Sequence, residues 1–196
     1  MNPTATSFTT EEQSLLLALA RTAIEAQAAG MPDPAVESAS LPPALRELRG
    51  CFVTLTRKGE LRGCIGNIYP HEPLYRAVME NARGAAFRDT RFAPVAEWEL
   101  PELEMEISVL TEPERLEFNT PEELLHKLRP NVDGVVVKFD WRSATFLPQV
   151  WRKFPDPVRF LDLLAQKAQL PAGAWRDPNT VVLTYQVESF ESLGCC

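Results

Sequence analysis

The sequence of 196 residues is poor in cysteine and histidine, and this shortage excludes several kinds of site. It has four cysteines and two histidines. No pair of them has the spacing of zinc ligands, so we expect no structural metal. Cys195 and Cys196 are adjacent at the C-terminal end, whereas Cys51 and Cys64 lie in predicted strands. This arrangement is not a disulfide framework, and it fits a protein of the reducing cytoplasm.

Long apolar runs and the common nucleotide-binding motifs are also missing. No run of about 18 apolar residues occurs, so we expect no membrane span. The first ten residues are polar and do not resemble a signal peptide. Phosphate-binding glycine loops, the nucleophile elbow of serine hydrolases and the HExxH zinc motif are absent from the sequence. The net charge of -7 argues against general binding to nucleic acid, because an acidic surface repels phosphates.

The residues that are present predict helices and strands in mixed order. A capping box at Thr10–Gln13 opens a first helix that Gly30 ends, and Thr120 and Asp156 cap two later helices. A further helix is predicted from Pro73 to Phe87. Short helices are predicted around 45–48 and from Pro94, and strands at 51–56, 61–65, 103–109, 135–139, 144–147 and 180–190.

This order favours an α+β fold with antiparallel sheets and helices packed on them. Tight turns join consecutive strands, and Gly59 is predicted to supply a positive φ in the first hairpin. A doubly wound parallel sheet would need regular strand–helix alternation, which the sequence lacks. We see no internal repeat, so the length fits one domain or two small ones.

The hairpin sequence Leu61–Gly66 is the most distinctive candidate site. Because side chains alternate along a strand, we predict that Arg62, Cys64 and Gly66 share one face. A guanidinium beside a thiol favours the thiolate, so Arg62 would activate Cys64 as a nucleophile. Gly63 and Gly66 would let a ligand or another backbone approach closely. The alternative is that Cys64 is a buried cysteine that acts as a small hydrophobic residue.

The end of the helix at 73–87 forms a second candidate site. Asn81, Gly84, Ala85 and Arg88 share a helix face, and Arg88, Asp89 and Arg91 concentrate charge at its end. One interpretation is a site for a polar or anionic ligand. The alternative is that the cations complement the helix dipole and pair with the aspartate.

Glu104 and Glu106 are predicted to lie on one face of a strand. A pair of carboxylates supports acid–base chemistry if one of them is buried. The alternative is that both are solvated and have no function in catalysis.

Four ordered blocks of sequence carry a family resemblance. They are Leu61–Gly66, Ala85–Phe92, Glu106–Leu110 and Thr145–Val150. Together they resemble the AMMECR domain family, and the likeness runs from roughly Ser14 to Phe190. Gln169 stands where many members have glycine, at a predicted helix end away from these blocks.

The resemblance implies a single AMMECR-type domain over residues 1–196 with two subdomains, the larger of them built from both chain ends. The family's shared residues collect at a cleft between the subdomains. Carried over, the candidate catalytic residues are Cys64, Arg62 and Glu106, and the candidate ligand-binding residues are Gly63, Gly66, Asn81, Asp89 and Arg91. The resemblance implies no particular cofactor.

Prokaryotic members are similar to protein A of the AmmeMemoRadiSam system, which implies a Memo-like protein and a radical SAM protein as partners in a modification pathway. Two functions stay open. The chain is an enzyme, or an enzyme subunit, acting on a small polar or anionic molecule, with Asp89 or Glu106 handling protons. Otherwise it is a non-catalytic module that recruits a peptide, metabolite or partner protein. No histidine adjoins Cys64 in the sequence, which favours the second function slightly.

Overall fold

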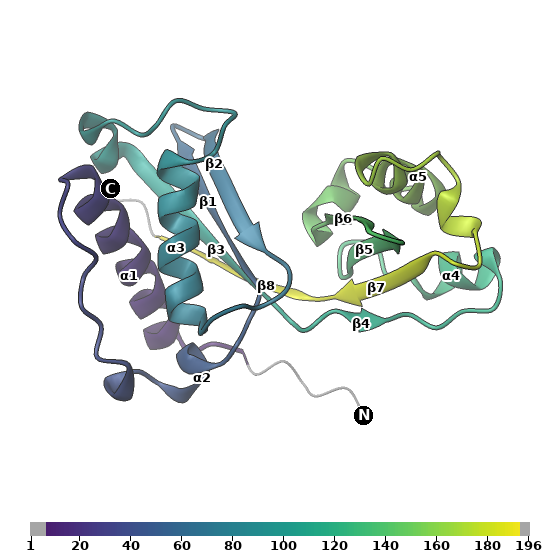
Figure 1. Cartoon of the computed structure of the whole chain (residues 1–196), viewed down its shortest axis with the longest axis horizontal. Helices are drawn as coiled ribbons and strands as arrows, with labels where there is room; N and C mark the ends of the chain where they lie inside the picture. The colour runs from purple at the N-terminus through teal and green to yellow at the C-terminus, as the bar shows by residue number, and fades with distance from the viewer. Residues whose placement is uncertain (1–6, 193–196) are drawn as a thin grey trace. The chain divides into compact units, whose positions relative to one another are not determined.

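The chain forms two compact units, each with its own sheet and core (Figure 1). The computed structural model describes residues 7–192. One unit takes the chain up to Leu110 and again from Glu188, and the other takes Thr111 to Val187. Both sheets are antiparallel and flanked by helices, so the predicted α+β class is confirmed.

The larger unit holds a four-stranded sheet in the order β2-β1-β3-β8. Strand β1 is antiparallel to both β2 and β3. In chain order the elements of this unit are α1 (Thr10–Ala28), a 3-10 turn at Ser38–Ser40, α2 (Pro43–Arg46), β1 (Cys51–Arg57), β2 (Glu60–Asn67), α3 (Leu74–Phe87), a 3-10 segment at Glu97–Glu102, β3 (Leu103–Leu110) and β8 (Val187–Glu191).

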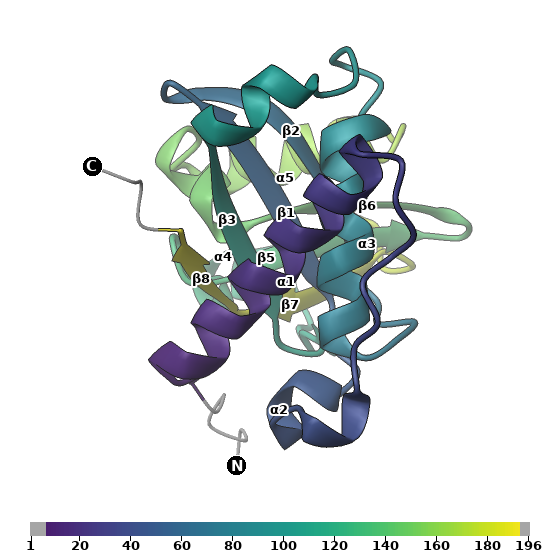
Figure 2. The same ribbon diagram turned by 90° about the vertical axis from the view of Figure 1, so that its left-hand side faces the viewer.

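Helices α1 and α3 cover one face of this sheet. Both views show them side by side on the same side of the strands (Figures 1 and 2). Alternate residues of β1 face them and are fully buried, namely Cys51, Val53 and Leu55. The helices contribute small and aliphatic side chains at helical spacing, which lets them lie close to the strands.

The smaller unit holds a second four-stranded sheet in the order β4-β7-β5-β6. Its core includes the stacked rings of Trp151 and Phe160, whose centroids lie 3.7 Å apart. In chain order its elements are β4 (Glu114–Arg115), α4 (Pro121–Lys127), β5 (Gly134–Phe139), β6 (Arg142–Phe146), a 3-10 turn at Pro148–Arg152, α5 (Pro157–Lys167), a 3-10 turn at Ala174–Arg176 and β7 (Val181–Tyr185).

The predicted helix starts are correct for α4 and α5 and one residue off for α1. Thr120 and Asp156 accept hydrogen bonds from backbone N–H groups of the first turns, as N-caps do. The first helix is capped by Thr9, whose capping box uses Glu12 in place of the predicted Thr10 and Gln13. Both threonines fit the motif, and the carboxylate of Glu12 is the stronger acceptor for a backbone N–H.

Two short helices also differ from the prediction. The helix expected from Pro94 begins at Glu97, because the carboxylate of Glu99 accepts the N–H of Ala96 at 2.9 Å and fixes the turn there. Helix α2 ends at Arg46, and Leu48 is exposed beyond it.

The predicted single strand at Thr180–Phe190 is wrong, because it is two strands that belong to different sheets. Strands β7 and β8 separate at Gln186, which pairs with Thr111. The N–H of Thr111 donates to the carbonyl of Gln186 at 3.0 Å. The hydroxyl of Thr111 accepts the N–H of Gln186 at 2.9 Å. Strand-forming residues run through the break, so composition alone does not reveal it.

Candidate functional site

A β-bulge shapes the hairpin that carries the candidate site. Leu55 pairs with Gly63, but the next residue of β1, Thr56, pairs with Leu61, so Arg62 is an extra residue in β2. The prediction that Arg62 and Cys64 share a face assumed strict alternation, which a bulge interrupts. The bulge gives Arg62 a direction that the strand pattern does not predict.

The guanidinium of Arg62 is held by Glu99. Its Nε donates to Oε1 and its Nη2 to Oε2, each at 2.9 Å, in a two-pronged ion pair. Glu99 is 5% exposed and also accepts from Arg57 at 3.1 Å. Arg62 above all lowers the pKa of Glu99 to about 2, so this carboxylate stays charged at neutral pH. Activation of Cys64 by Arg62 stays a prediction.

Glu99 is a residue that the sequence reasoning missed. It lies 37 positions from Arg62 along the chain, in a segment with several other acidic residues. No local pattern distinguishes it from its solvated neighbours.

Asp89 and Arg91 bind the backbone of Cys64 at the edge of the sheet. Strand β2 is an edge strand, and such a strand leaves alternate N–H and C=O groups unpaired. The N–H of Cys64 donates to Asp89 Oδ2 at 2.9 Å, and its carbonyl accepts from Arg91 Nη2 at 3.3 Å. The structure therefore brings these three predicted site residues together.

The carboxylate of Asp89 is buried and fully engaged. Besides Cys64, it accepts hydrogen bonds from the backbone N–H, Nε and Nη2 of Arg91 at 3.1, 2.9 and 2.6 Å. These bonds, with the guanidinium first, hold the pKa of Asp89 well below its usual range. A carboxylate held so strongly in its charged form is a poor proton acceptor at neutral pH.

The two glycines of the motif lie against protein atoms. A Cβ on Gly63 would collide with the carbonyl of Ala85 in α3. A Cβ on Gly66 would collide with the ring of Phe52 and with the carbonyl of Cys51. The sequence leaves open whether a ligand or another backbone approaches these glycines. At Gly63, the structure shows the close approach of a backbone, that of α3. Contact of either glycine with a ligand stays a prediction.

Asn81 lies on the opposite side of the sheet from the thiol of Cys64. Its Nδ2 donates to the carbonyl of Cys51 at 3.1 Å and lies 3.3 Å from the Cys51 sulfur. Cys51 faces the helices, and burial raises the pKa of its thiol to about 12. Asn81 therefore joins α3 to β1 and does not reach the face on which Cys64 lies.

Cys64, Thr54 and Glu106 form a row across three strands. Thr54 is in register with Cys64 of β2 and with Glu106 of β3. Its hydroxyl donates to the Cys64 sulfur at 3.4 Å. The row lies on the face away from α1 and α3, because it alternates with the buried residues of β1.

Two serine hydroxyls lie beside this row on the same face. Ser108 donates to Glu106 at 3.2 Å and lies 2.8 Å from the hydroxyl of Ser189. We call the face that carries Thr54, Cys64, Glu106, Ser108 and Ser189 the polar sheet face; Ser108 is buried in it, and Ser189 is exposed. Glu104 shares this face near its end, where it accepts from Thr56 at 3.3 Å.

The remaining features of the described residues concern metal ions and membranes. Residues 7–192 contain no group of three or more His, Cys, Asp or Glu side chains placed to hold a metal ion. The helices within this range include none that is long and apolar enough to cross a bilayer. Cys195 and Cys196 lie outside the described residues. The predicted cleft between subdomains stays a prediction, and the site is described within the larger unit.

Comparisons with known proteins agree with this architecture. The AMMECR1 family model matches residues 17–190. A protein of Methanothermobacter thermautotrophicus is 40% identical over 185 residues, which cover 94% of this chain and 96% of the relative. Protein MJ0810 of Methanocaldococcus jannaschii is 35% identical, with 95% of this chain and 92% of the relative covered. The crystal structure of uncharacterized protein PH0010 from Pyrococcus horikoshii superposes with a TM-score of 0.86 at 37% identity, and the match covers 94% of this chain and 93% of that one. The chain belongs to the AMMECR1 family.

Proposed function

We propose that this protein is a binding module whose polar sheet face holds a small polar molecule that carries an amine. One observation carries the proposal: the other charged groups predicted for the site already form ion pairs, whereas Glu106 is not neutralised by a cationic partner. Arg62 is paired with Glu99, and Asp89 with Arg91. Among residues 7–192, no lysine or arginine forms an ion pair with Glu106, which accepts from the hydroxyl of Ser108.

The chemistry of the polar sheet face supports this class of ligand. The carboxylate and the hydroxyl oxygens are hydrogen-bond acceptors. Glu104 and Glu106 both lie on this face, so of the polar and anionic ligands that the sequence leaves open, it favours a polar one with a cationic group. A charged hydrogen bond from an amine to Glu106 would be the strongest single contact.

The test compares two glutamates of the same strand. Purified protein is incubated with a mixture of polar metabolites, and the retained molecules are identified by native mass spectrometry. We expect Glu106→Gln to lose the retained amine and the matched control Glu104→Gln to keep it. Identical retention by wild type and Glu106→Gln would contradict the proposal.

A second candidate function is a thiol enzyme at the same face, favoured by the row itself. Cys64 is a partly exposed residue, its sulfur accepts from Thr54, and its row contains the carboxylate of Glu106. We expect iodoacetamide to label Cys64 faster than the buried Cys51, whose pKa is raised to about 12 by burial. Peptide mass mapping separates the two sites from the other cysteines.

Whether the retained molecule is chemically converted distinguishes a binding module from an enzyme. A binding module with Cys64→Ser retains its ligand unchanged, as the wild type does. An enzyme converts the retained molecule, and Cys64→Ser then accumulates the unconverted form.

The family resemblance supports a Memo-like protein and a radical SAM protein as partners in a modification pathway. Free thiols at Cys51 and Cys64 support a reducing compartment such as the cytoplasm. Co-expression of the three chains followed by purification through this one tests the partnership, and failure of both partners to co-purify would count against it.

A further inference from the structure

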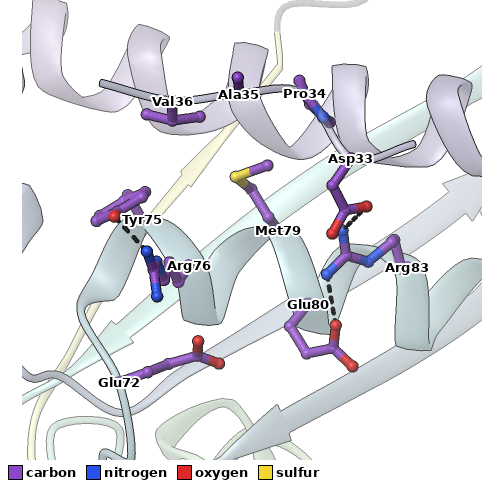
Figure 3. A pocket seen from close by; sticks show the side chains of 10 residues that line it. All are labelled: Asp33, Pro34, Ala35, Val36, Glu72, Tyr75, Arg76, Met79, Glu80 and Arg83. Atoms are coloured by element: carbon purple, nitrogen blue, oxygen red, sulfur yellow. Dashed lines mark hydrogen bonds and ion pairs between the residues drawn. The ribbon is translucent and has the colours of Figure 1, made fainter. Parts of the chain in front are cut away.

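A cavity of about 470 Å³ lies in the larger unit between α3 and the segment Asp33–Val36 (Figure 3). This volume is within the range of small-molecule sites. The cavity belongs to the outer side of α3, so it is separate from the polar sheet face. Its lining combines apolar residues, among them Val36 and Met79, with five charged ones, namely Asp33, Glu72, Arg76, Glu80 and Arg83.

One end of the cavity is neutralised by its own ion pairs. Arg83 pairs with Asp33 and with Glu80, the latter at 2.5 Å. Glu80 is also paired with Arg88 at 2.5 Å. Two carboxylates and two guanidinium groups therefore balance each other here. This end ties the segment to α3 and leaves no net charge for a ligand.

The other end keeps a hydrogen-bond donor pair free for an anion. Figure 3 shows Tyr75 and Arg76 together there, and Nε of Arg76 donates to the Tyr75 hydroxyl at 3.0 Å. Because that hydroxyl accepts from Arg76, its own proton stays available for an acceptor. Arg76 is an exposed residue, and among residues 7–192 its guanidinium forms no other hydrogen bond and no ion pair. A carboxylate at this point would receive hydrogen bonds from both groups.

Glu72 supplies the opposite charge at the same end. Figure 3 shows its carboxylate below Tyr75 and Arg76. Among residues 7–192, no hydrogen bond or ion pair engages this carboxylate, although a guanidinium lines the same cavity. An anion-binding pair, a free carboxylate and an apolar wall thus meet in one pocket.

We propose that this cavity binds a zwitterion with an apolar body, either a free α-amino acid or a short apolar peptide. Its carboxylate binds Tyr75 and Arg76, and its ammonium group binds Glu72. Its apolar side chain packs on Met79, which is 6% exposed, and on Val36 of the facing segment. This site goes beyond the proposed function and does not depend on it.

Isothermal titration calorimetry tests the ligand class and distinguishes its two sources. The probes are L-leucine and the dipeptide Leu-Leu, with N-acetyl-L-leucine lacking the ammonium group and L-leucinamide lacking the carboxylate. We expect at least one zwitterion to bind. Each analogue that lacks one of the two charged groups should bind at least roughly tenfold more weakly. Tighter binding of leucine or of Leu-Leu identifies the source. Equal binding of N-acetyl-L-leucine, or no binding of either zwitterion, would overturn the proposal.

Charge-removing variants assign the binding to this cavity. We expect Arg76→Gln and Glu72→Gln each to weaken the zwitterion roughly tenfold. Both side chains reach solvent, so circular dichroism should show an unchanged fold. The matched control is Arg152→Gln, at an exposed arginine of the smaller unit. Wild-type affinity in both cavity variants would overturn the site.

The variant Glu106→Gln distinguishes binding in this cavity from binding at the polar sheet face. We expect it to leave zwitterion binding unchanged. Loss of zwitterion binding in Glu106→Gln but in neither cavity variant would move the ligand to the polar sheet face and refute the cavity site.

Discussion

Asp89 and Arg91 do at single-residue scale what a neighbouring strand does for a sheet edge. They satisfy both the N–H and the carbonyl of Cys64, so the edge of β2 is closed at the residue that carries the thiol. These hydrogen bonds join two of the sequence blocks that carry the family resemblance, Leu61–Gly66 and Ala85–Phe92. The same bonds leave Asp89 without spare acceptor capacity for a substrate proton.

Gly63 provides a direct test of close packing between β2 and α3. Gly63→Ala places a methyl group against the Ala85 carbonyl, so we expect a loss of about 1–3 kcal/mol in the free energy of unfolding. Urea denaturation measures this loss. Gly84→Ala is the comparison variant, because its Cβ would meet a side-chain methyl group of Ile65 at 3.0 Å, whereas that of Gly63→Ala would collide with a backbone carbonyl. Wild-type stability of Gly63→Ala with lost ligand retention would instead indicate that a ligand approaches this glycine.

Glu99 predicts a pH dependence of stability. Its pKa is lowered to about 2 in the folded chain, whereas an unfolded glutamate titrates near 4.3. A lowered folded pKa stabilises the fold above the unfolded pKa, and this contribution is lost as pH falls toward the folded pKa. We expect the wild type to lose on the order of 1–2 kcal/mol through this group between about pH 5 and pH 2.

The variant Glu99→Gln isolates that contribution. We expect it to be less stable at neutral pH, because Arg62 and Arg57 lose their shared partner, and to change less on acidification. Glu97→Gln, two residues away and exposed, controls for the loss of a carboxylate. Parallel pH profiles of wild type and Glu99→Gln in urea denaturation would show that the ion pair is not responsible.

At the scale of elements, local sequence signals predict the helices and most of the strands. They do not predict contacts between residues that are far apart along the chain. Caps at Thr120 and Asp156 depend on neighbouring residues, so the sequence shows them directly. The bulge at Arg62 depends on the register with β1, and its partner Glu99 is far along the chain. The split of β7 from β8 depends on the two hydrogen bonds between Thr111 and Gln186.

The same limit applies to the candidate site. The strand pattern correctly placed Glu104 and Glu106 on one face, because alternation is a local property. It did not predict that Thr54 lies between Cys64 and Glu106, since that row depends on the register of three strands. The family resemblance groups Asn81 with Cys64, yet the sheet separates their side chains.

Thr111 tests the break between β7 and β8. Thr111→Val removes the hydroxyl that accepts the Gln186 N–H, so we expect a loss of about 1–2 kcal/mol in the free energy of unfolding. Thr111→Ser keeps the acceptor and should restore most of the stability. Equal stability of the valine and serine variants in chemical denaturation would show that the hydroxyl does not stabilise this turn.

At the scale of the whole molecule, each unit has its own hydrophobic core, but the two differ in how the chain builds them. The smaller unit is continuous from Thr111 to Val187, whereas the larger one is completed only when the chain returns at Glu188. The Ser108–Ser189 pair of the polar sheet face spans 81 positions. The proposed binding surface therefore depends on the last strand of the fold, and closing so long a loop costs conformational entropy.

The charge of the whole chain gives the last prediction. With 27 acidic and 20 basic residues, the protein carries a net charge of -7. Several of its arginines, among them Arg62, Arg83 and Arg91, are already paired with carboxylates. Little counterion release is available on binding to DNA, so we expect no binding to generic duplex DNA tighter than about 10 µM at physiological salt.

Fluorescence anisotropy of a labelled duplex, titrated with protein between about 50 and 200 mM salt, measures this affinity and its salt dependence. A flat titration agrees with the prediction. Submicromolar binding that weakens steeply with salt would contradict it, because only a cluster of unpaired basic side chains gives that slope. Such a cluster would have to consist of arginines or lysines that are not paired with Glu99, Glu80 or Asp89. The surface that carries it would then be the candidate nucleic-acid site.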